Sequence, residues 1–130
     1  MERTRINVTY QRLTMENAVI LCIDDERVVL NGLQSQLSRE FGGQYGIELT
    51  ESGEEALALM EELQRSGHDI PIVISDQVMP GLKGHEVLKH IHKASPSTYT
   101  VLLTGQSDFE AVTEAIKYAN LYRYIAKPWE

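Results

Sequence analysis

Short runs of apolar residues alternate along the chain with longer segments in which apolar residues recur every three or four positions. Continuous apolar runs are typical of strands covered on both faces, and the longer spacing is typical of one buried face of a helix. The pattern predicts strands over residues 19–23, 45–50, 70–74, 99–103 and 122–126. It predicts helices over residues 29–37, 56–63, 87–91 and 109–119. This regular alternation favours a parallel α/β sheet.

Two helices begin with a recognisable capping sequence. Residues 52–55 (SGEE) and 107–110 (SDFE) each place a serine three positions before a glutamate, which is the order of a capping box. Asn120 is expected to end the last helix in a left-handed conformation. The apolar face predicted for that helix consists of Phe109, Val112, Ile116 and Ala119.

The composition is that of an ordinary globular domain. The 130 residues are 42% hydrophobic and 24% charged, which is enough for one domain and too few for two. A single cysteine excludes an internal disulfide, and Cys22 is expected to be a core residue because it lies within an apolar run. No apolar run approaches the ~20 residues that cross a bilayer, so we expect no membrane partner and a cytoplasmic location.

The net charge argues against a nucleic-acid partner. The formal charge is −7, from 12 Lys and Arg against 19 Asp and Glu, and no stretch gathers a basic cluster. A surface of this sign repels phosphate backbones. We therefore expect no binding of nucleic acid by this domain.

Chemically useful side chains follow the ends of four predicted strands. In parallel α/β sheets, ligand sites form where the strands end. If the strand order brings these four strands together, one crevice holds carboxylates, a hydroxyl and an ammonium group. The residues concerned are Asp24, Asp25 and Glu26, then Asp76, Thr104 and Lys127.

This combination of side chains suits phosphoryl chemistry. Carboxylates a few ångströms apart cannot all remain ionised cheaply unless a cation lies among them, and Mg²⁺ prefers such oxygen ligands. One carboxylate can then attack a phosphoryl group as a nucleophile. The hydroxyl of Thr104 and the ammonium of Lys127 would stabilise the charge on the phosphoryl oxygens.

The order of these motifs resembles the receiver domain of two-component response regulators. Residues 24–25 (DD), 76–81 (DQVMPG), 104–105 (TG) and 127–128 (KP) carry the resemblance, each at a predicted strand end. It covers about residues 19–129, so we expect a receiver domain over 19–130 and an N-terminal extension over 1–18. The resemblance implies a flavodoxin-like three-layer sandwich, with a parallel sheet in the order 2-1-3-4-5 and helices on both faces.

The resemblance also implies a metal-dependent phosphorylation site. Asp76 would be the phospho-acceptor. Asp25 would bind Mg²⁺ directly, with Mn²⁺ as an alternative ion, and Asp24 would act at least partly through water. The backbone carbonyl of Val78 would complete the protein ligands.

Further residues would read out or tune the phosphorylated state. The resemblance implies that Thr104 and Lys127 contact the phosphoryl group and that Tyr124 changes its rotamer. Val78 and Gln106 occupy positions that tune phosphoryl lifetime in the family.

These features imply a signalling switch without turnover of a free substrate. The resemblance implies a sensor histidine kinase or a phosphotransfer protein as donor, and an output domain or partner that reads the surface of the fourth helix and fifth strand. Residues 120–129 are similar to receivers joined to HD-type cyclic-dinucleotide phosphodiesterases and nucleotide cyclases, which suggests a cyclic-nucleotide-related output enzyme.

The sequence departs from the family pattern at its end. Receivers continue past the Lys-Pro pair into a fifth helix, whereas this sequence stops at Glu130. We interpret the chain as a fragment of a longer protein, or as one whose bare flank is covered by the first eighteen residues or by a second copy. The bare flank predicts an apolar strip and self-association as a homodimer.

Three other classes of protein remain as alternatives. A phosphatase of the haloacid-dehalogenase type would need a second aspartate two residues after its nucleophile at the first strand, where this chain has an adjacent pair. A flavodoxin-like cofactor binder would need a loop rich in Ser, Thr and Gly after that strand. An interaction domain that is never phosphorylated would not need the acidic set.

The histidines are interpreted as surface residues rather than metal ligands; they are His68, His85, His90 and His92.

Overall fold

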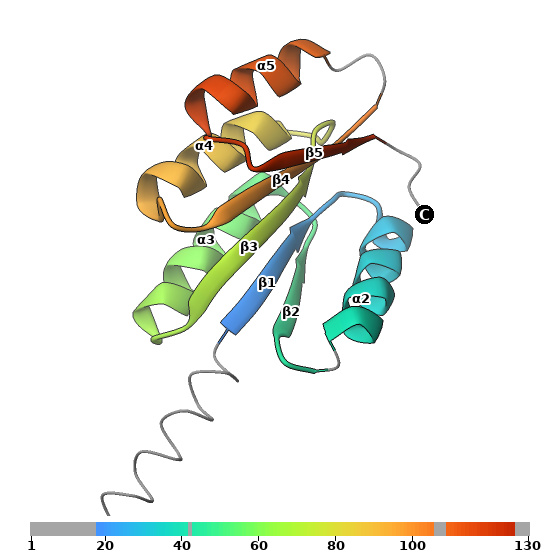
Figure 1. Cartoon of the computed structure of the whole chain (residues 1–130), viewed down its shortest axis with the longest axis vertical. Coiled ribbons are helices and arrows are strands. Elements are labelled where there is room, and N and C mark those ends of the chain that lie inside the picture. Colours follow the sequence, from blue (N-terminus) through green and yellow to red (C-terminus); the bar gives the residue numbers. More distant parts are fainter. Residues whose placement is uncertain (1–17, 42, 106–108, 127–130) are drawn as a thin grey trace, which may run out of the picture.

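A computed structural model of the chain describes residues 18–41, 43–105 and 109–126. Within these ranges strands and helices alternate, and Figure 1 shows the strands side by side in one sheet. The strands are β1 (Ala18–Ile23), β2 (Gly46–Thr50), β3 (Asp69–Asp76), β4 (Tyr99–Thr104) and β5 (Arg123–Ala126). The helices are α2 (Arg27–Phe41), α3 (Gly53–Arg65), α4 (Gly84–Ala94) and α5 (Phe109–Tyr118).

The sheet has the predicted order and direction. Its five strands run in the order β2-β1-β3-β4-β5, and every neighbouring pair is parallel. The continuous apolar run of β1 is buried between β2 and β3, whereas β2 lies at an edge and alternates between exposed and partly buried residues. The predicted α/β class and the order 2-1-3-4-5 are both confirmed.

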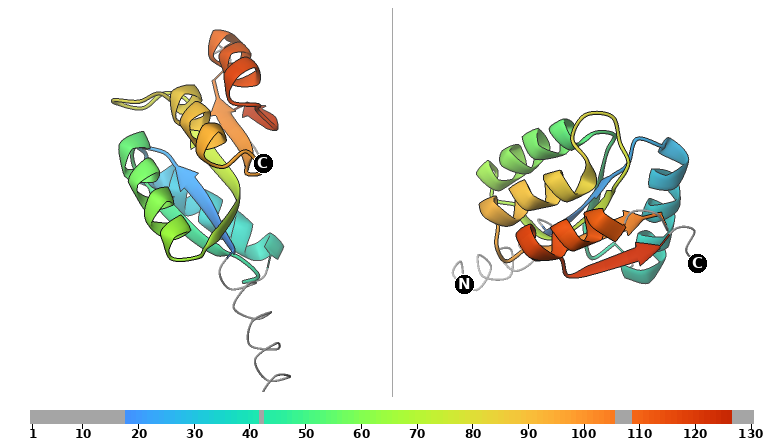
Figure 2. Two further views of the ribbon diagram at one scale, coloured as in Figure 1. Left: turned by 90° about the vertical axis from the view of Figure 1, so that its left-hand side faces the viewer. Right: turned by 90° about the horizontal axis from the view of Figure 1, so that it is seen from above.

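Helices cover both faces of the sheet, but unevenly (Figure 2). Helices α3, α4 and α5 pack on one face, where their buried residues form a core with Leu21, Val73 and Leu102. Among the described residues, α2 is the one helix that packs on the opposite face, where Leu30 and Leu33 contact alternate residues of the same strands.

A groove runs beside α2 on this less covered face. It has a volume of about 470 Å³, and it lies between α2 and the side of the sheet formed by β3, β4 and β5. Apolar residues of α2, β3, β4 and β5 form much of its lining. The groove is lined by Leu33, Gln36, Leu37, Arg39, Glu40, Ile74, Leu103 and Ile125.

The local signals predicted from the sequence are mostly found. The Ser52 hydroxyl accepts a hydrogen bond from the Glu55 N–H at 3.1 Å and caps α3. Asn120 follows α5 with a φ of 49°. Pro71 lies where the pairing register of β1 and β3 shifts, so its missing N–H interrupts no regular ladder.

One predicted core position is wrong. Ile116 was assigned to the apolar face of the last helix, but its side chain is 57% exposed. The buried residues of α5 and its end are Val112, Ala115 and Ala119. Ala115 faces the core, so Ile116, the next residue along the helix, faces outward. The capping sequence at 107–110 falls largely outside the described residues.

No helix in the described part of the chain combines the length and apolar character needed to cross a bilayer.

Candidate functional site

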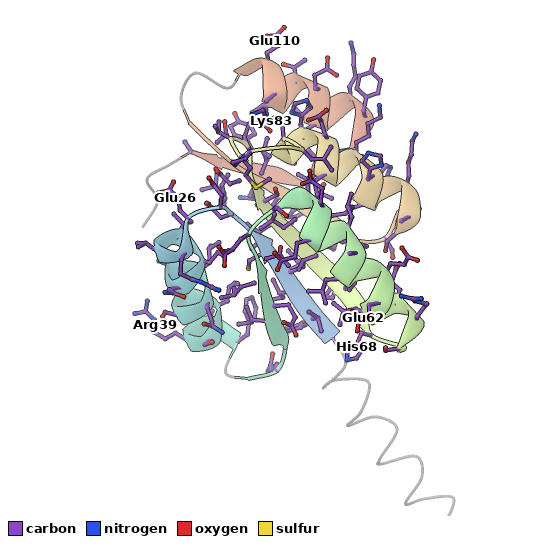
Figure 3. All side chains as sticks on the ribbon, turned by 180° about the vertical axis from the view of Figure 1, so that it is seen from behind. Glu26, Arg39, Glu62, His68, Lys83 and Glu110 are labelled. Carbon is purple, nitrogen blue, oxygen red and sulfur yellow. The ribbon has the colours of Figure 1, made fainter. Side chains whose placement is uncertain are left out.

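Three aspartates meet where β1 and β3 end. These strands are parallel neighbours, and Ile23 pairs with Ser75, so the residues that follow emerge at the same level of the sheet. Asp24, Asp25 and Asp76 each place a carboxylate oxygen within 4.8 Å of the others. In Figure 3 the labels of Glu26 and Lys83 mark this end of the sheet.

The three carboxylates differ in burial. The side chains of Asp24 and Asp76 are 0% and 5% exposed, whereas Asp25 is exposed. Two carboxylates at the bottom of the site and one at its rim form an acidic cluster that is open to solvent. A cation among them would relieve their mutual repulsion, and all three offer the hard oxygen ligands that Mg²⁺ prefers. The donor set therefore fits Mg²⁺, which Asp24, Asp25 and Asp76 would hold.

Asp24 is held in place by the backbone around it. One of its carboxylate oxygens accepts a hydrogen bond from the Glu26 N–H at 2.9 Å, and its own N–H donates to the Thr50 carbonyl at 3.1 Å. The first bond closes a tight turn before α2, and the second ties this turn to the end of β2. The position of Asp24 is thus fixed from both sides.

The loop between β3 and α4 is tightly packed, and the first residue of α4 lies against Asp76. A Cβ on Gly84 would lie 2.2 Å from the Asp76 carbonyl oxygen, so only glycine allows α4 to begin here. Gly81 has a φ of +78°, and a Cβ there would lie 2.6 Å from the Glu54 carboxylate. The Lys83 ammonium donates to the Met79 carbonyl at 3.1 Å.

The remaining site residues predicted from the sequence lie at or just after the ends of β3 and β4, within β5, or outside the described residues. Val78 follows Asp76 by two positions; its side chain is exposed, and its expected role needs only its backbone carbonyl. Thr104 ends β4 in a buried position, and its hydroxyl donates to the Gly105 carbonyl at 3.0 Å. Tyr124 lies in β5, opposite Leu102, with an exposed side chain. Lys127 and Gln106 lie outside the described residues.

A hydrogen-bonded pair beside Asp76, formed by the buried Gln77 and the partly buried His85, was not predicted from the sequence. Gln77 is 6% exposed, and its side-chain amide contacts both the backbone and the ring of His85. The interpretation of His85 as a surface residue is therefore incomplete, because it is only partly exposed. The one available signal was that Gln77 is a polar residue directly after a buried strand. Nothing in the sequence spacing pairs it with His85, eight positions later.

The fold and the site together define a parallel α/β domain with an acidic cluster at the carboxyl edge of its sheet. The family model of the response regulator receiver domain matches residues 20–130. The chain belongs to this family, and it is a receiver domain of two-component signalling.

Relatives and solved structures agree with this assignment. The uncharacterized transcriptional regulatory protein YesN of Bacillus subtilis is 36% identical over 110 residues, which cover 84% of this chain and 28% of YesN. The chain spans about a quarter of the length of curated relatives such as YesN.

Two solved structures show the same fold. The receiver domain of an HD domain-containing protein from Pseudomonas fluorescens Pf-5 is 33% identical with a TM-score of 0.75, covering 87% of this chain and 84% of that one. An adenylate cyclase structure from Rhodopirellula baltica is 28% identical with a TM-score of 0.69, covering 86% of this chain and 77% of that one.

Proposed function

We propose that this domain is a phosphorylation switch whose acceptor is Asp76. The observation that carries the proposal is the cluster of Asp24, Asp25 and Asp76, with carboxylate oxygens within 4.8 Å of one another. Asp76 is buried at the end of β3 and fixed by the packed loop that follows it. The three carboxylates and the backbone carbonyl of Val78 would hold Mg²⁺, or Mn²⁺ in its place, which would neutralise charge on the phosphoryl group.

The proposed phosphoryl transfer needs no reactant besides the phosphorylated donor. A carboxylate oxygen of Asp76 attacks the phosphorus of a phosphohistidine on a sensor histidine kinase or phosphotransfer protein. A P–O bond forms while the P–N bond breaks, and the ring nitrogen leaves with the electron pair and takes up a proton. The product is an acyl phosphate on Asp76, so we expect no turnover of free phosphate esters.

The switch would operate through neighbouring side chains. The acyl phosphate carries about −1.5 to −2 charges where the Asp76 carboxylate carried −1, and it brings three acceptor oxygens. The Thr104 hydroxyl, which donates to Gly105 in this structure, would donate to a phosphoryl oxygen instead and draw its loop inward. Lys127 would pair with another oxygen, and Tyr124 would turn from its exposed position. Gln106 and Val78 would set the lifetime of the acyl phosphate.

The altered surface of α5 and β5 would then be read by an output domain. The similar structures that name an HD domain and an adenylate cyclase support a cyclic-nucleotide-related enzyme as that output. The acidic composition supports a protein partner rather than nucleic acid. The cytoplasmic location stays a prediction.

Mass spectrometry of the intact chain tests the proposal. After incubation with Mg²⁺ and acetyl phosphate, we expect a gain of one phosphoryl group in the unmodified chain and in Asp69→Asn, an exposed control at the start of β3. We expect no gain in Asp76→Asn. Steady turnover of free phosphate esters would instead indicate a phosphatase, and neither reaction would indicate an interaction domain that is not phosphorylated.

A further inference from the structure

Gln77 lies between two residues that the proposed metal site uses, and it is held by four hydrogen bonds. Its N–H donates to the Leu103 carbonyl at 3.0 Å, and its carbonyl accepts from the Gly84 N–H at 3.0 Å. Its side-chain oxygen accepts from the His85 N–H at 2.9 Å, and its side-chain nitrogen lies 2.8 Å from Nδ1 of His85. Gln77 therefore links the end of β3 to β4 and to the first turn of α4.

The His85 N–H fixes the orientation of the Gln77 amide. A backbone N–H can only donate, so the atom facing it must be the oxygen Oε1. The nitrogen Nε2 then faces the imidazole, and because Nε2 only donates, Nδ1 of His85 must accept. The link thus needs an acceptor at Nδ1 and is specific to these two side chains.

The side chain of Gln77 also completes the start of α4. The first N–H groups of a helix have no partner within it. Those of Gly84 and His85 are bound by the backbone and side-chain oxygens of Gln77. Because Gly84 leaves no space against the Asp76 carbonyl, a movement of α4 in this region is transmitted directly to the acceptor residue.

We propose that the Gln77–His85 pair positions the Asp76 carboxylate and the Val78 carbonyl for Mg²⁺. Both are positioning residues, since neither need touch the ion. The inference rests on the proposed function, because it concerns the metal ligands assigned there. Loss of the link would leave the buried side-chain amide of Gln77 without its acceptor, which costs free energy. Gln77 would move to regain a hydrogen-bond partner, and this movement would shift the backbone that joins Asp76 to Val78.

The test compares three variants of α4. His85→Leu removes the acceptor and keeps the bulk, His85→Asn restores an acceptor oxygen near the place of Nδ1, and His90→Leu makes the same change at an exposed position of the same helix. By calorimetric titration with Mg²⁺ alone, we expect His85→Leu to bind about threefold to tenfold more weakly. His85→Asn and His90→Leu should bind within about twofold of the original chain.

Phosphorylation by acetyl phosphate separates positioning from a general loss of structure. In His85→Leu the Mg²⁺ concentration for half-maximal rate should rise, while the rate at saturating Mg²⁺ is retained. If thermal melting shows that His85→Leu does not fold, Gln77→Asn, whose shorter side chain cannot reach both atoms of His85, takes its place with the same expectation.

Two results would overturn the inference. One is unchanged Mg²⁺ binding in the variant that lacks the link, and the other is equal weakening in His85→Leu and His85→Asn. Either leaves the proposed function intact provided that the original chain binds Mg²⁺ and is phosphorylated. Failure of the original chain to bind Mg²⁺ would instead refute the metal site itself.

Discussion

Burial divides the acidic residues of the site into two kinds. Asp24 and Asp76 are almost completely buried, whereas Asp25 reaches solvent. A buried carboxylate loses hydration, which is costly unless hydrogen bonds or a cation compensate it. The Glu26 N–H compensates Asp24 in part. Two of the three clustered carboxylates are therefore held in a buried position where a cation among them is favourable, and this supports a role for a bound cation.

Cys22 shows the same effect of burial on a different group. It lies in the middle of β1 with no exposed surface, and burial raises the pKa of its thiol from 9.0 to about 12. In the unfolded chain the thiol ionises above pH 9, whereas the folded chain retains the proton. The unfolded state is therefore favoured as pH rises, and stability is lost between pH 9 and about pH 12.

We predict that this loss disappears when Cys22 is replaced. Urea unfolding at a series of pH values should give a free energy of unfolding that falls with rising pH above pH 9. This fall should be steeper in the original chain than in Cys22→Ala, by at most about 1.4 kcal/mol per pH unit. All other ionisable groups are the same in both proteins, so the difference between the two slopes belongs to Cys22. Parallel slopes above pH 9 would show that the thiol is not protected by the fold.

At the scale of elements, the close approach of α4 to the end of β3 constrains the backbone at Asp76. Gly84, the first residue of α4, lies against the backbone of Asp76, whereas Gly32 in α2 is exposed with no atom within 4 Å of a Cβ. The same substitution should therefore have opposite effects at these two glycines. At Gly84 the lack of space for a Cβ outweighs the higher helix propensity of alanine.

We predict that Gly84→Ala lowers the free energy of unfolding by about 1–3 kcal/mol, because backbone atoms cannot move aside as a flexible side chain can. Gly32→Ala should raise it by about 0.5–1 kcal/mol through helix propensity. Chemical denaturation measures both values. If Gly84→Ala leaves the free energy of unfolding unchanged, α4 can shift away from β3. The contact of Gly84 with Asp76 would then not be what fixes the site.

The elements themselves followed from the sequence because each depends on a local pattern. The apolar run of β1 predicted a strand covered on both faces, and the alternation in β2 predicted one nearer an edge. The strand order came from the resemblance to receiver domains, and this order brings Asp24, Asp25 and Asp76 together. Ile116 was misassigned because helical spacing cannot tell which of two adjacent apolar residues faces the core. The Gln77–His85 link was missed because it joins a strand end to a helix start through side-chain contacts that no periodicity records.

At the scale of the molecule, the two faces of the sheet are not equally covered. Parallel sheets are normally buried on both faces. Here three helices pack on one face, and α2 packs alone on the other in the described part of the chain, beside a groove of about 470 Å³. Leu37, Ile74 and Ile125 are among the apolar residues that line it. Removal of this surface from water would favour association at about 25 cal/mol per Å² of apolar area.

We predict that the 130-residue chain self-associates through this groove, with a second copy covering the apolar strip. Light scattering after size exclusion should give a mass that rises from monomer towards dimer with concentration. Leu37→Glu, which places a charge in the groove, should keep the chain monomeric. Ile116→Glu, at an exposed apolar residue on the opposite side of the sheet, is the matched control and should leave association unchanged. A monodisperse monomer at high concentration would show that the groove does not bind a second copy, and equal loss of association in both variants would place the contact elsewhere.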